Sequence, residues 1–296
     1  MSFLSTLISG ISLGSMYALI ALGYTMVYGI AKMLNFAHGE VIMIGGIATY
    51  EILAVMGMNA YVAIVVAIVV CTVLGVVVEK IAYKPLRTAG SLAVLITAIG
   101  VSYFLQNIAL LTFGSAYKSY TIQELKFSWD ITSNFSIQGT TIINITLTVV
   151  IMVALTLFIR FTKTGRSMLA VSEDRDAAQL MGINVNGVIS VTFAIGSALA
   201  GVAGFLFLGT YGQIGAYSGT MPGIKAFTAA VFGGIGSIPG AMLGGIVLGI
   251  IEQFSKSILS EFQLSSFSDA VVFIVLIAVL LIKPTGILGK KVTEKV

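Results

Sequence analysis

One charged stretch divides a chain that is otherwise apolar: Arg160-Phe-Thr-Lys-Thr-Gly-Arg-Ser-Met-Leu-Ala-Val-Ser172-Glu-Asp-Arg-Asp-Ala-Ala-Gln-Leu-Met-Gly182-Ile-Asn-Val-Asn-Gly187. It holds four of the sixteen basic residues and three of the twelve acidic residues. Ser172 is a favourable N-cap, and the acidic side chains after it lie where the helix dipole stabilises anions. Gly182 suits the left-handed position that ends a helix. The stretch therefore predicts a short, capped helix in water between two membrane spans, where another protein can hold it.

The rest of the chain has the composition of a membrane protein. Of its 296 residues, 57% are hydrophobic and 9% are charged, whereas soluble domains carry about 25% charged residues. Apolar runs of about 20 residues recur, and they do not alternate as the strands of a β-barrel would. We therefore predict an all-α, polytopic helical membrane protein with a single transmembrane domain over residues 1–296 and a loop at 160–187. The net charge of +4 lies beside the apolar runs, so it indicates topology rather than nucleic-acid binding.

About eight apolar segments can be recognised. They cover roughly residues 4–30, 36–55, 61–78, 92–113, 142–161, 188–208, 225–254 and 270–282. The first segment has neither a basic region before it nor a small-residue cleavage site, so we expect a retained span and not a signal peptide. The single cysteine, Cys71, lies in an apolar run and excludes a disulfide framework.

Lysine and arginine indicate the orientation. Basic residues flank the connections at 80–87 and 160–175 and recur in the tail at 283–295, so the positive-inside rule places all three in the cytoplasm. The polar stretch 114–139 has few basic residues and contains Trp129, as expected at the outer interface. We therefore expect an external N-terminus and a cytoplasmic C-terminus.

The glycine-rich region 225–254 must then enter and leave on one side, or cross twice, because the next span starts outside. Its thirty residues are too few for two full spans of about 20 residues each. We predict two half-helices that meet at Gly233-Gly-Ile-Gly-Ser-Ile-Pro-Gly240, beside a translocation path, because irregular backbone at membrane depth survives only inside protein or along a cavity. Bulk at Gly234 is expected to harm transport more than bulk at Gly249. The alternative is one kinked helix and an external C-terminus.

Polar residues inside the apolar runs are further candidates. Asn35, His38 and Glu40 surround the start of the second span, where they either line a path or are read by a partner subunit. Alternatively, Asn35 caps the helix at the membrane surface and Glu40 lies in its first turn. Tyr17 and Tyr24 are seven positions apart and share one face of the first span, as path residues or as packing.

Motifs for several other functions are missing. His38 and Glu40 are two positions apart, which disfavours a helical metal site. No phosphate-binding loop of the type G-x-x-x-x-G-K-[ST] is present. A single histidine leaves no visible Ser-His-Asp or zinc arrangement. We therefore expect no metal site and no enzymatic activity in this chain.

Three motifs carry a resemblance to a known family. The run Gly14-Ser-Met-Tyr-Ala-Leu-Ile-Ala-Leu-Gly-Tyr-Thr-Met-Val-Tyr-Gly29, followed by Asn35-Phe-Ala-His-Gly39, resembles the LivH-type permease subunits of branched-chain amino-acid ABC transporters. The stretch Asp176-Ala-Ala-x-x-x-Gly182 is similar to the permease coupling motif E-A-A-x-x-x-G, with aspartate in place of glutamate. The glycine-rich stretch from Gly233 to Gly240 is also like the family's. The resemblance runs from about Leu4 to Gly286.

This resemblance implies a permease of the bacterial inner membrane, surrounded by lipid, which forms a path for Leu, Ile or Val with a second, LivM-like permease subunit. A periplasmic binding protein would deliver the substrate. Two cytoplasmic ATPase subunits would bind ATP and Mg, and this chain would hold no cofactor. The residues implied in coupling to the ATPase are Ser172, Glu173, Asp174, Arg175, Asp176, Ala177, Ala178 and Gly182. Those assigned to the path are Tyr17, Tyr24, Asn35, His38, Glu40, Gly233, Gly234 and Gly236.

Two alternatives stay open at this point. Related importer permeases carry amides or urea, and only the resemblance speaks for amino acids. An ion-coupled secondary transporter would explain broken helices and polar clusters. It needs intramembrane ionisable groups, which are scarce in this sequence, and it has no use for a capped helix over Ser172–Gly182.

Overall fold

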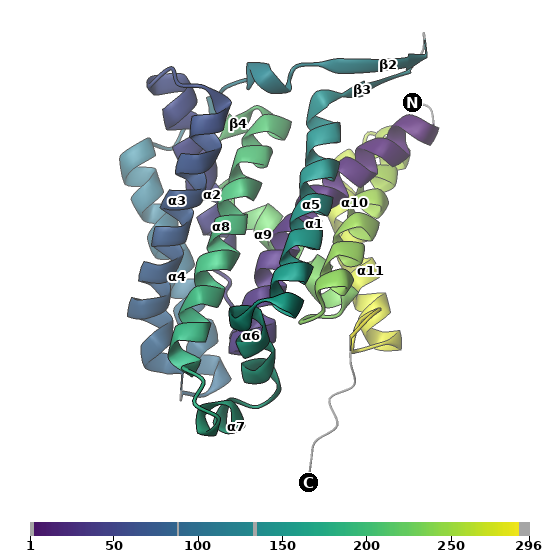
Figure 1. Ribbon diagram of the computed structural model, residues 1–296. Helices are drawn as coiled ribbons and strands as arrows, with labels where there is room; N and C mark the ends of the chain where they lie inside the picture. Colours follow the sequence, from purple (N-terminus) through teal and green to yellow (C-terminus); the bar gives the residue numbers. More distant parts are fainter. Residues whose placement is uncertain (1–2, 88, 133–134, 290–296) are drawn as a thin grey trace.

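The computed structural model describes residues 3–87, 89–132 and 135–289. Within them, eight helices are long and apolar enough to cross a membrane, which confirms the predicted polytopic helical fold (Figure 1). These are α1 (Phe3–Ala31), α2 with the π-helical turn that continues it (His38–Val55), α3 with its continuation (Ala60–Leu86), α4 (Ser91–Phe113), α5 (Gly139–Phe161), α8 (Val185–Tyr211), α10 (Ile238–Ser260) and a last span (Ser265–Ile282) that contains α11 (Ser268–Ile282).

The bundle has two distinct ends. The short helices α6 (Lys163–Glu173) and α7 (Arg175–Leu180) form one end, which we name the α7 end (Figure 1). The antiparallel hairpin of β2 (Ser128–Thr132) and β3 (Phe135–Gln138) lies across the other, the hairpin end. The charged loop and the polar stretch 114–139 thus lie at opposite ends, as predicted. The lysines predicted to make the tail basic at 290, 291 and 295 lie outside the described residues.

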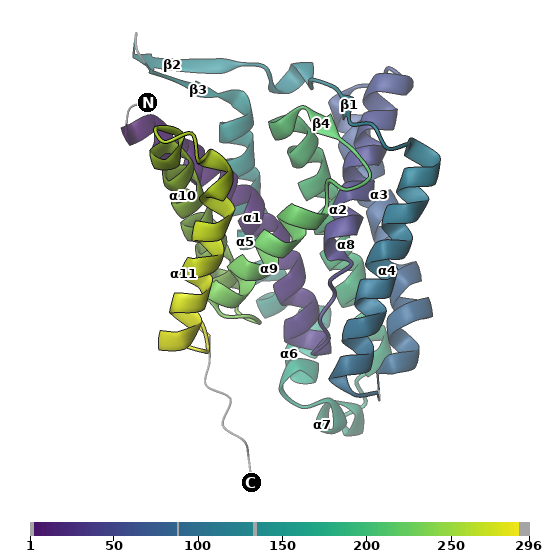
Figure 2. The same ribbon diagram turned by 180° about the vertical axis from the view of Figure 1, so that it is seen from behind.

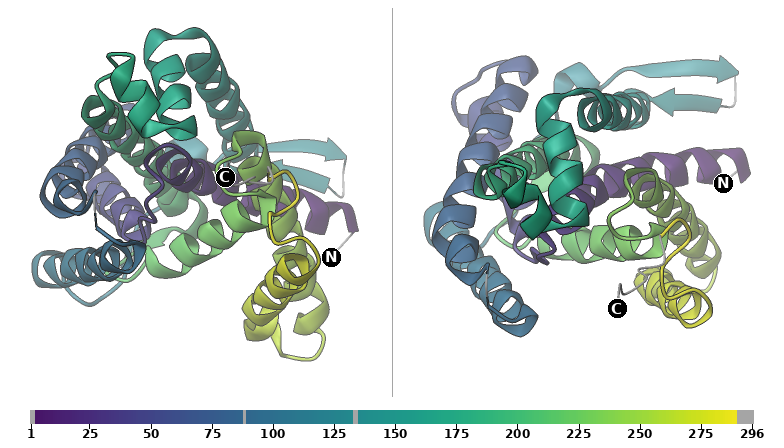
Figure 3. Two further views of the ribbon diagram at one scale, coloured as in Figure 1. Left: turned by 90° about the horizontal axis from the view of Figure 1, so that it is seen from below. Right: turned by 60° about the horizontal axis from the view of Figure 1, so that its bottom comes forward.

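Helix α1 runs obliquely through the middle of the bundle (Figure 3). Its 29 residues span roughly 43 Å, longer than the ~30 Å hydrocarbon core of a bilayer, so tilt accommodates the excess length. Glycines let α10 approach it closely. A Cβ on Gly249 would lie 2.2 Å from the Cα of Gly14, and a Cβ on Gly14 would lie 2.6 Å from the Cα of Ile246. The two backbones therefore touch, as small residues permit in membranes.

The outer helices present apolar faces to their surroundings. Leu111 of α4, Val150 of α5 and Leu281 of α11 are 86, 56 and 81% exposed. A soluble monomer rarely exposes so much contiguous apolar surface. This surface is the part of the bundle that lipid or another membrane subunit covers.

Two helices begin inside the bundle rather than at its surface. After α1, residues 32–37 turn back alongside it (Figure 2). Consequently His38, the first residue of α2 (His38–Tyr50), packs edge-on against the Tyr24 ring at 4.7 Å. Tyr24 is seven residues, roughly 10 Å, before the end of α1. The second such helix is α9 (Thr220–Gly233), reached by the strand β4 (Gln213–Ile214), which pairs with β1 (Lys118–Ser119).

Helices α9 and α10 form an antiparallel pair around a sharp turn. A Cβ on Gly244 would lie 2.2 Å from the carbonyl oxygen of Ala229, so the two helices run back alongside each other. The predicted break is confirmed, and a single kinked helix is wrong. Of the two predicted half-helices, only α9 is short, with 14 residues. The prediction is wrong for α10, which is a full-length helix of 23 residues. The missing length of α9 is supplied by the irregular segment before Thr220.

Candidate functional site

The charged stretch forms two short helices rather than the one predicted. Thr162 caps α6, since its side chain accepts a hydrogen bond from the Gly165 N–H at 2.9 Å. Helix α6 therefore starts well before Ser172. That residue lies inside α6 and donates to the Leu169 carbonyl at 2.7 Å, so the prediction that Ser172 is the N-cap is wrong.

Helix α7 has its own cap, Asp174. Its Oδ1 accepts hydrogen bonds from the N–H groups of Asp176 and Ala177, both at 2.9 Å. Glu173 is the last residue of α6. The prediction that it lies in the first turn of the helix that ends at Gly182 is therefore wrong. Gly182 follows the end of α7 with φ +82°, as its predicted left-handed position requires.

One face of α7 is open to a partner. Leu180 and Met181 are 89 and 82% exposed, and Ala177 beside them is exposed as well. Ala178 is buried against this chain at 4% exposure and belongs to its core. The exposed surface of α7 therefore combines apolar side chains with the polar Asp176 and Gln179, and it does not include the side chain of Ala178.

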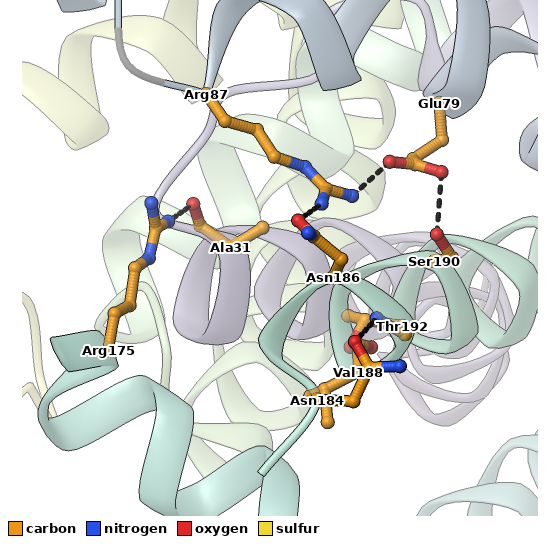
Figure 4. A network of polar contacts seen from close by, with 10 residues as sticks. Ala31, Glu79, Arg87, Arg175, Asn184, Asn186, Val188, Ser190 and Thr192 are labelled. Carbon is orange, nitrogen blue, oxygen red and sulfur yellow. Dashed lines mark hydrogen bonds and ion pairs between the residues drawn. The ribbon is translucent and has the colours of Figure 1, made fainter. Parts of the chain in front are cut away.

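Arg175, the first residue of α7, ties this helix to α1. Its guanidinium donates to the carbonyl oxygen of Ala31, the last residue of α1 (Figure 4). Partial burial and the nearby positive charge of Arg87 lower the pKa of Arg175, while Asp176 acts in the opposite direction. The contact gives a partner to the last carbonyl of α1, which is otherwise unsatisfied. It also places a positive charge at the C-terminal end of α1, where the helix dipole stabilises cations.

A second polar connection fastens α8 to the end of α3. Glu79 accepts from the Arg87 guanidinium and, at 2.8 Å, from the Ser190 hydroxyl (Figure 4). Arg87 also donates to the side chain of Asn186 in the first turn of α8. Because Glu79 is fully buried and paired, the connection is rigid. The helix that follows the charged loop is thereby locked to its neighbour.

Glu40 lies where the first residues of α2 and α9 meet. Its Oε1 accepts hydrogen bonds from Gln106 at 2.8 Å, Ser102 at 3.2 Å and Thr220 at 3.3 Å. The backbones touch there, since a Cβ on Gly39 would lie 2.6 Å from the Gly219 carbonyl oxygen. Glu40 is 1% exposed. The position suits a carboxylate, because the N-terminal ends of two helices point their positive dipole ends toward it.

Asn35 and His38 are buried too, so the prediction of a cap at the membrane surface is wrong. Residue Ala37 precedes α2 without any side-chain cap, whereas the Asn35 Oδ1 accepts from the Tyr83 hydroxyl at 2.8 Å. No described residue hydrogen-bonds the Nε2 of His38. The structure therefore brings Tyr24, His38 and Glu40 into one buried region, with Asn35 at its side. A role of these residues in a path stays a prediction.

The three glycines assigned to the path lie at the turn between α9 and α10. A Cβ on Gly233 would lie 1.9 Å from the Gly240 carbonyl oxygen, and one on Gly234 would lie 2.4 Å from the Gly289 nitrogen. Gly234 and Gly236 have φ +106° and +93°, which favour glycine. Their observed contacts are with this chain's own backbone, and their place in a path stays a prediction.

Tyr17 lies apart from these residues, on a cleft of about 960 Å³. The cleft is lined by residues of α1, α8, α9, α10 and α11 and of the loop that joins α10 to α11. This loop lies toward the hairpin end (Figure 2). Besides Tyr17, its walls include Phe207, Met221, Lys225, Lys256 and Asp269. Its volume is within the ~300–1,000 Å³ range of small-molecule sites.

An ion network contributes part of the wall of this cleft, with its central carboxylate, Glu252, buried behind the wall. Glu252 is fully buried and accepts from Tyr17 at 2.9 Å, Lys225 at 2.9 Å and Lys256 at 2.5 Å. The ammonium of Lys225 also contacts the Asp269 carboxylate at 2.7 Å. We name Tyr17, Lys225, Glu252, Lys256 and Asp269 the ion network.

Sequence reasoning missed four of these five residues and found only Tyr17. Burying one charge at membrane depth costs about 3 kcal/mol on the insertion scale. The pairing therefore decides whether these charges are tolerated. A usable signal was present: Glu252 and Lys256 are four apart in an apolar run, so they share a helix face. Lys225 and Asp269 carry no comparable local signal, because their partners are distant in sequence.

No cluster of three or more His, Cys, Asp or Glu side chains able to hold a metal ion occurs among the described residues. The exposed α7 face can bind a protein, and the cleft can bind a small polar solute.

Comparison with known proteins places this arrangement in a family. Residues 6–280 match the family described as "Branched-chain amino acid transport system / permease component". The chain is 48% identical to the high-affinity branched-chain amino acid transport system permease protein LivH of Escherichia coli K12, over 99% of this chain and 98% of that one. It is 45% identical to the corresponding protein BraD of Pseudomonas aeruginosa, with the same coverage.

A more distant relative is the probable branched-chain amino acid transport permease protein LivH of Methanocaldococcus jannaschii, 30% identical over 93% of this chain and 89% of that one. Matches at this length leave no large part of the chain unaccounted for. The chain therefore belongs to the family of branched-chain amino acid transport system permease components.

Proposed function

We propose that this chain is the permease subunit of an ATP-driven importer of Leu, Ile and Val in a bacterial inner membrane. The observation that carries the proposal is the near-complete overlap, at 45–48% identity, with permeases named for high-affinity branched-chain amino acid transport. The eight apolar helices and the absence of a phosphate-binding loop from the sequence agree with a subunit that relies on partners for ATP.

The α7 end faces the cytoplasm in this proposal, and the C-terminus with it. Its basic residues at 80–87 and 160–175 support that orientation. The exposed pair Leu180 and Met181 docks into an apolar groove on one of two ATPase subunits, which bind ATP and Mg. A central apolar anchor of this kind contributes much of the energy of an interface.

The hairpin end faces the periplasm, where a substrate-binding protein releases the amino acid. The lining of the cleft includes the loop between α10 and α11, which lies toward this side. A second, LivM-like permease subunit covers part of the exposed apolar surface and completes the path. Bilayer lipid covers the rest.

The test is uptake by the complete transporter in proteoliposomes. This chain is reconstituted with the second permease, both ATPases and the binding protein of the same genome. We expect labelled Leu, Ile and Val to enter only when ATP is supplied. Preferred uptake of urea or amides would replace the substrate, and uptake driven by an ion gradient without the ATPases would overturn the importer.

Docking through α7 is tested by co-purification. Leu180→Asp places a charge in the proposed apolar contact, so the variant should be membrane-inserted but lose the ATPase subunits. Leu169→Asp is the matched control, because Leu169 is 47% exposed on the neighbouring helix α6. Equal recovery of the ATPase with both variants would remove α7 as the docking element.

A further inference from the structure

The ion network reaches from the middle of the bundle, where Tyr17 lies, to the end of α10 and the start of α11, where Lys256 and Asp269 lie. Tyr17 is the central residue of α1 (Phe3–Ala31), and its hydroxyl reaches Glu252. Lys225, less than two turns into α9, is 7% exposed. Ionisable groups at this depth are rare and are most often retained for a function. A purely structural pair would need only two such groups, whereas this site has two cations and two carboxylates.

The four charged groups differ in their access to the cleft. Glu252 is fully buried and Lys225 is 8% exposed at its side chain, whereas Lys256 and Asp269 are 38 and 32% exposed. Lys225 and Glu252 are thus the fixed inner pair. Lys256 and Asp269, bonded to opposite members of that pair, present one positive and one negative group to the cleft.

Formal charge selects the ligand class. Within the ion network the two lysines balance the two carboxylates, and the further carboxylate of the cleft, Glu261, is exposed to solvent. A ligand with net charge would therefore leave an uncompensated charge at the buried part of the site. A ligand that carries both signs keeps the balance, because each of its groups pairs with one group of the cleft. A neutral amide or urea can hydrogen-bond here but gains no charge-assisted bond.

Part of the wall of the cleft is apolar. Phe207 and Met221 face it, together with tyrosines 117 and 217. A solute with a charged head and an aliphatic body therefore finds partners for both parts. The open volume of about 960 Å³ leaves room for such a solute and water.

We propose that this cleft binds the head group of a zwitterionic amino acid, with the carboxylate on Lys256 and the ammonium on Asp269. Lys225 and Glu252 are positioning residues that hold these two groups apart and oriented. The aliphatic side chain lies against Phe207 and Met221. This inference rests on the proposed function and deepens it, because it assigns a substrate site to a chain whose relatives are named only for transport.

The experiment measures protection of a reporter thiol by ligand. Cys71→Ala removes the natural cysteine, which is fully buried in α3. Ser257→Cys then places a thiol on the wall of the cleft. The complex of this chain with the second permease and both ATPases, without the binding protein, is treated with a small thiol reagent. The reaction is run in the presence of leucine, leucinamide or 4-methylpentanoate. The last two lack the carboxylate and the ammonium respectively.

We expect leucine to slow the modification, and both analogues to need concentrations at least about tenfold higher for the same protection. Lys256→Gln and Asp269→Asn should each weaken protection by leucine to a similar degree. Ser136→Cys on the hairpin is the control site, and its modification should not respond to leucine. If Lys256→Gln does not assemble, Asp269→Asn alone decides, since Asp269 is partly exposed.

Two results would overturn this inference. Leucine uptake with ATP but no protection by leucine would refute the cleft while leaving the proposed function intact. Equal protection by all three compounds would show that Lys256 and Asp269 do not recognise the charged groups of leucine. By contrast, an assembled complex with a working ATPase and no uptake of leucine would refute the proposed function itself.

Discussion

Arg175 joins two parts of the chain that must move together if α7 transmits a signal. It belongs to the short helix at the α7 end, and it holds the last carbonyl of α1. The residues after that carbonyl lead directly into the buried region around Glu40. A force on α7 therefore reaches the start of α2 through a single side chain.

Arg175→Met should uncouple ATP hydrolysis from transport. A hydrogen bond to a charged group is worth about 1.5–3 kcal/mol, which corresponds to roughly a tenfold change or more. We expect leucine uptake per ATP hydrolysed to fall by about tenfold, while the ATPase stays bound. Arg166→Met, at an exposed position of α6, is the control. An unchanged transport-to-ATPase ratio in Arg175→Met would contradict this role.

Lys225→Met tests the inner pair of the ion network by stability. It leaves Glu252 and Asp269 without the ammonium that joins them. Because Glu252 keeps the Lys256 ammonium, the loss should lie below the about 3–5 kcal/mol that a fully broken buried pair costs. The unfolding temperature of the purified protein in nanodiscs should fall clearly below that of Lys126→Met, where the lysine is exposed. Equal melting of the two variants would mean that the pair is not needed for folding.

At the scale of elements, the sequence predicted most helices within a few residues, because their apolar runs are long and end in polar or glycine residues. It failed where tertiary contacts decide. Asp174 and Ser172 are equally good caps by type, and only the start of α6 at its own cap Thr162 excludes Ser172. The depth of His38 was also hidden, because the reversal of residues 32–37 depends on packing beside Tyr24.

Gly182→Val tests the end of α7 through backbone conformation alone. No atom lies within 4 Å of a Cβ built at Gly182, so any effect stems from its φ of +82°. A β-branched residue in that conformation costs roughly 1–3 kcal/mol. We expect weaker binding of the ATPase and lower uptake. Gly90→Val is the matched control, since its surroundings are equally open and its φ is −64°. Equal activity of both variants would separate the end of α7 from coupling.

At the scale of the whole molecule, the glycines of α1 and α10 fix the position of the cleft. The sequence alone favoured Gly234 over Gly249 as the sensitive position. The structure changes this expectation, because Gly249 touches the backbone of Gly14. Such a contact between residues 235 positions apart has no local signal in the sequence.

Gly249→Leu should therefore be as harmful as Gly234→Leu. Its side chain would push α10 away from α1 and break the contact between Tyr17 and Glu252. We expect a loss of properly assembled protein, measured by size-exclusion chromatography and thermal melting. Gly100→Leu is the control, because nothing lies within 4 Å of a Cβ there. Normal assembly of Gly249→Leu would show that the two helices can separate without harm.

Orientation is tested by labelling single cysteines in the Cys71→Ala background. Ser136→Cys on the hairpin should react with an impermeant thiol reagent once the outer membrane is opened. Gln179→Cys, on the exposed side of α7, should react only after the inner membrane is opened as well. The reverse pattern would place the α7 end outside and end the cytoplasmic docking hypothesis.

The contact between α1 and α10 also has a consequence for biosynthesis. The first helix leaves the ribosome long before its principal glycine partner, since Gly14 and Gly249 are separated by most of the chain. Until α10 is inserted, the groove around Gly14 lacks the helix that packs into it, and the hydroxyl of Tyr17 lacks its hydrogen-bond acceptor Glu252. Contacts this distant in sequence close late and slowly. We infer that newly made α1 waits in the membrane beside lipid or the insertion machinery, and that truncation before α10 leaves it there as a target for quality-control proteases.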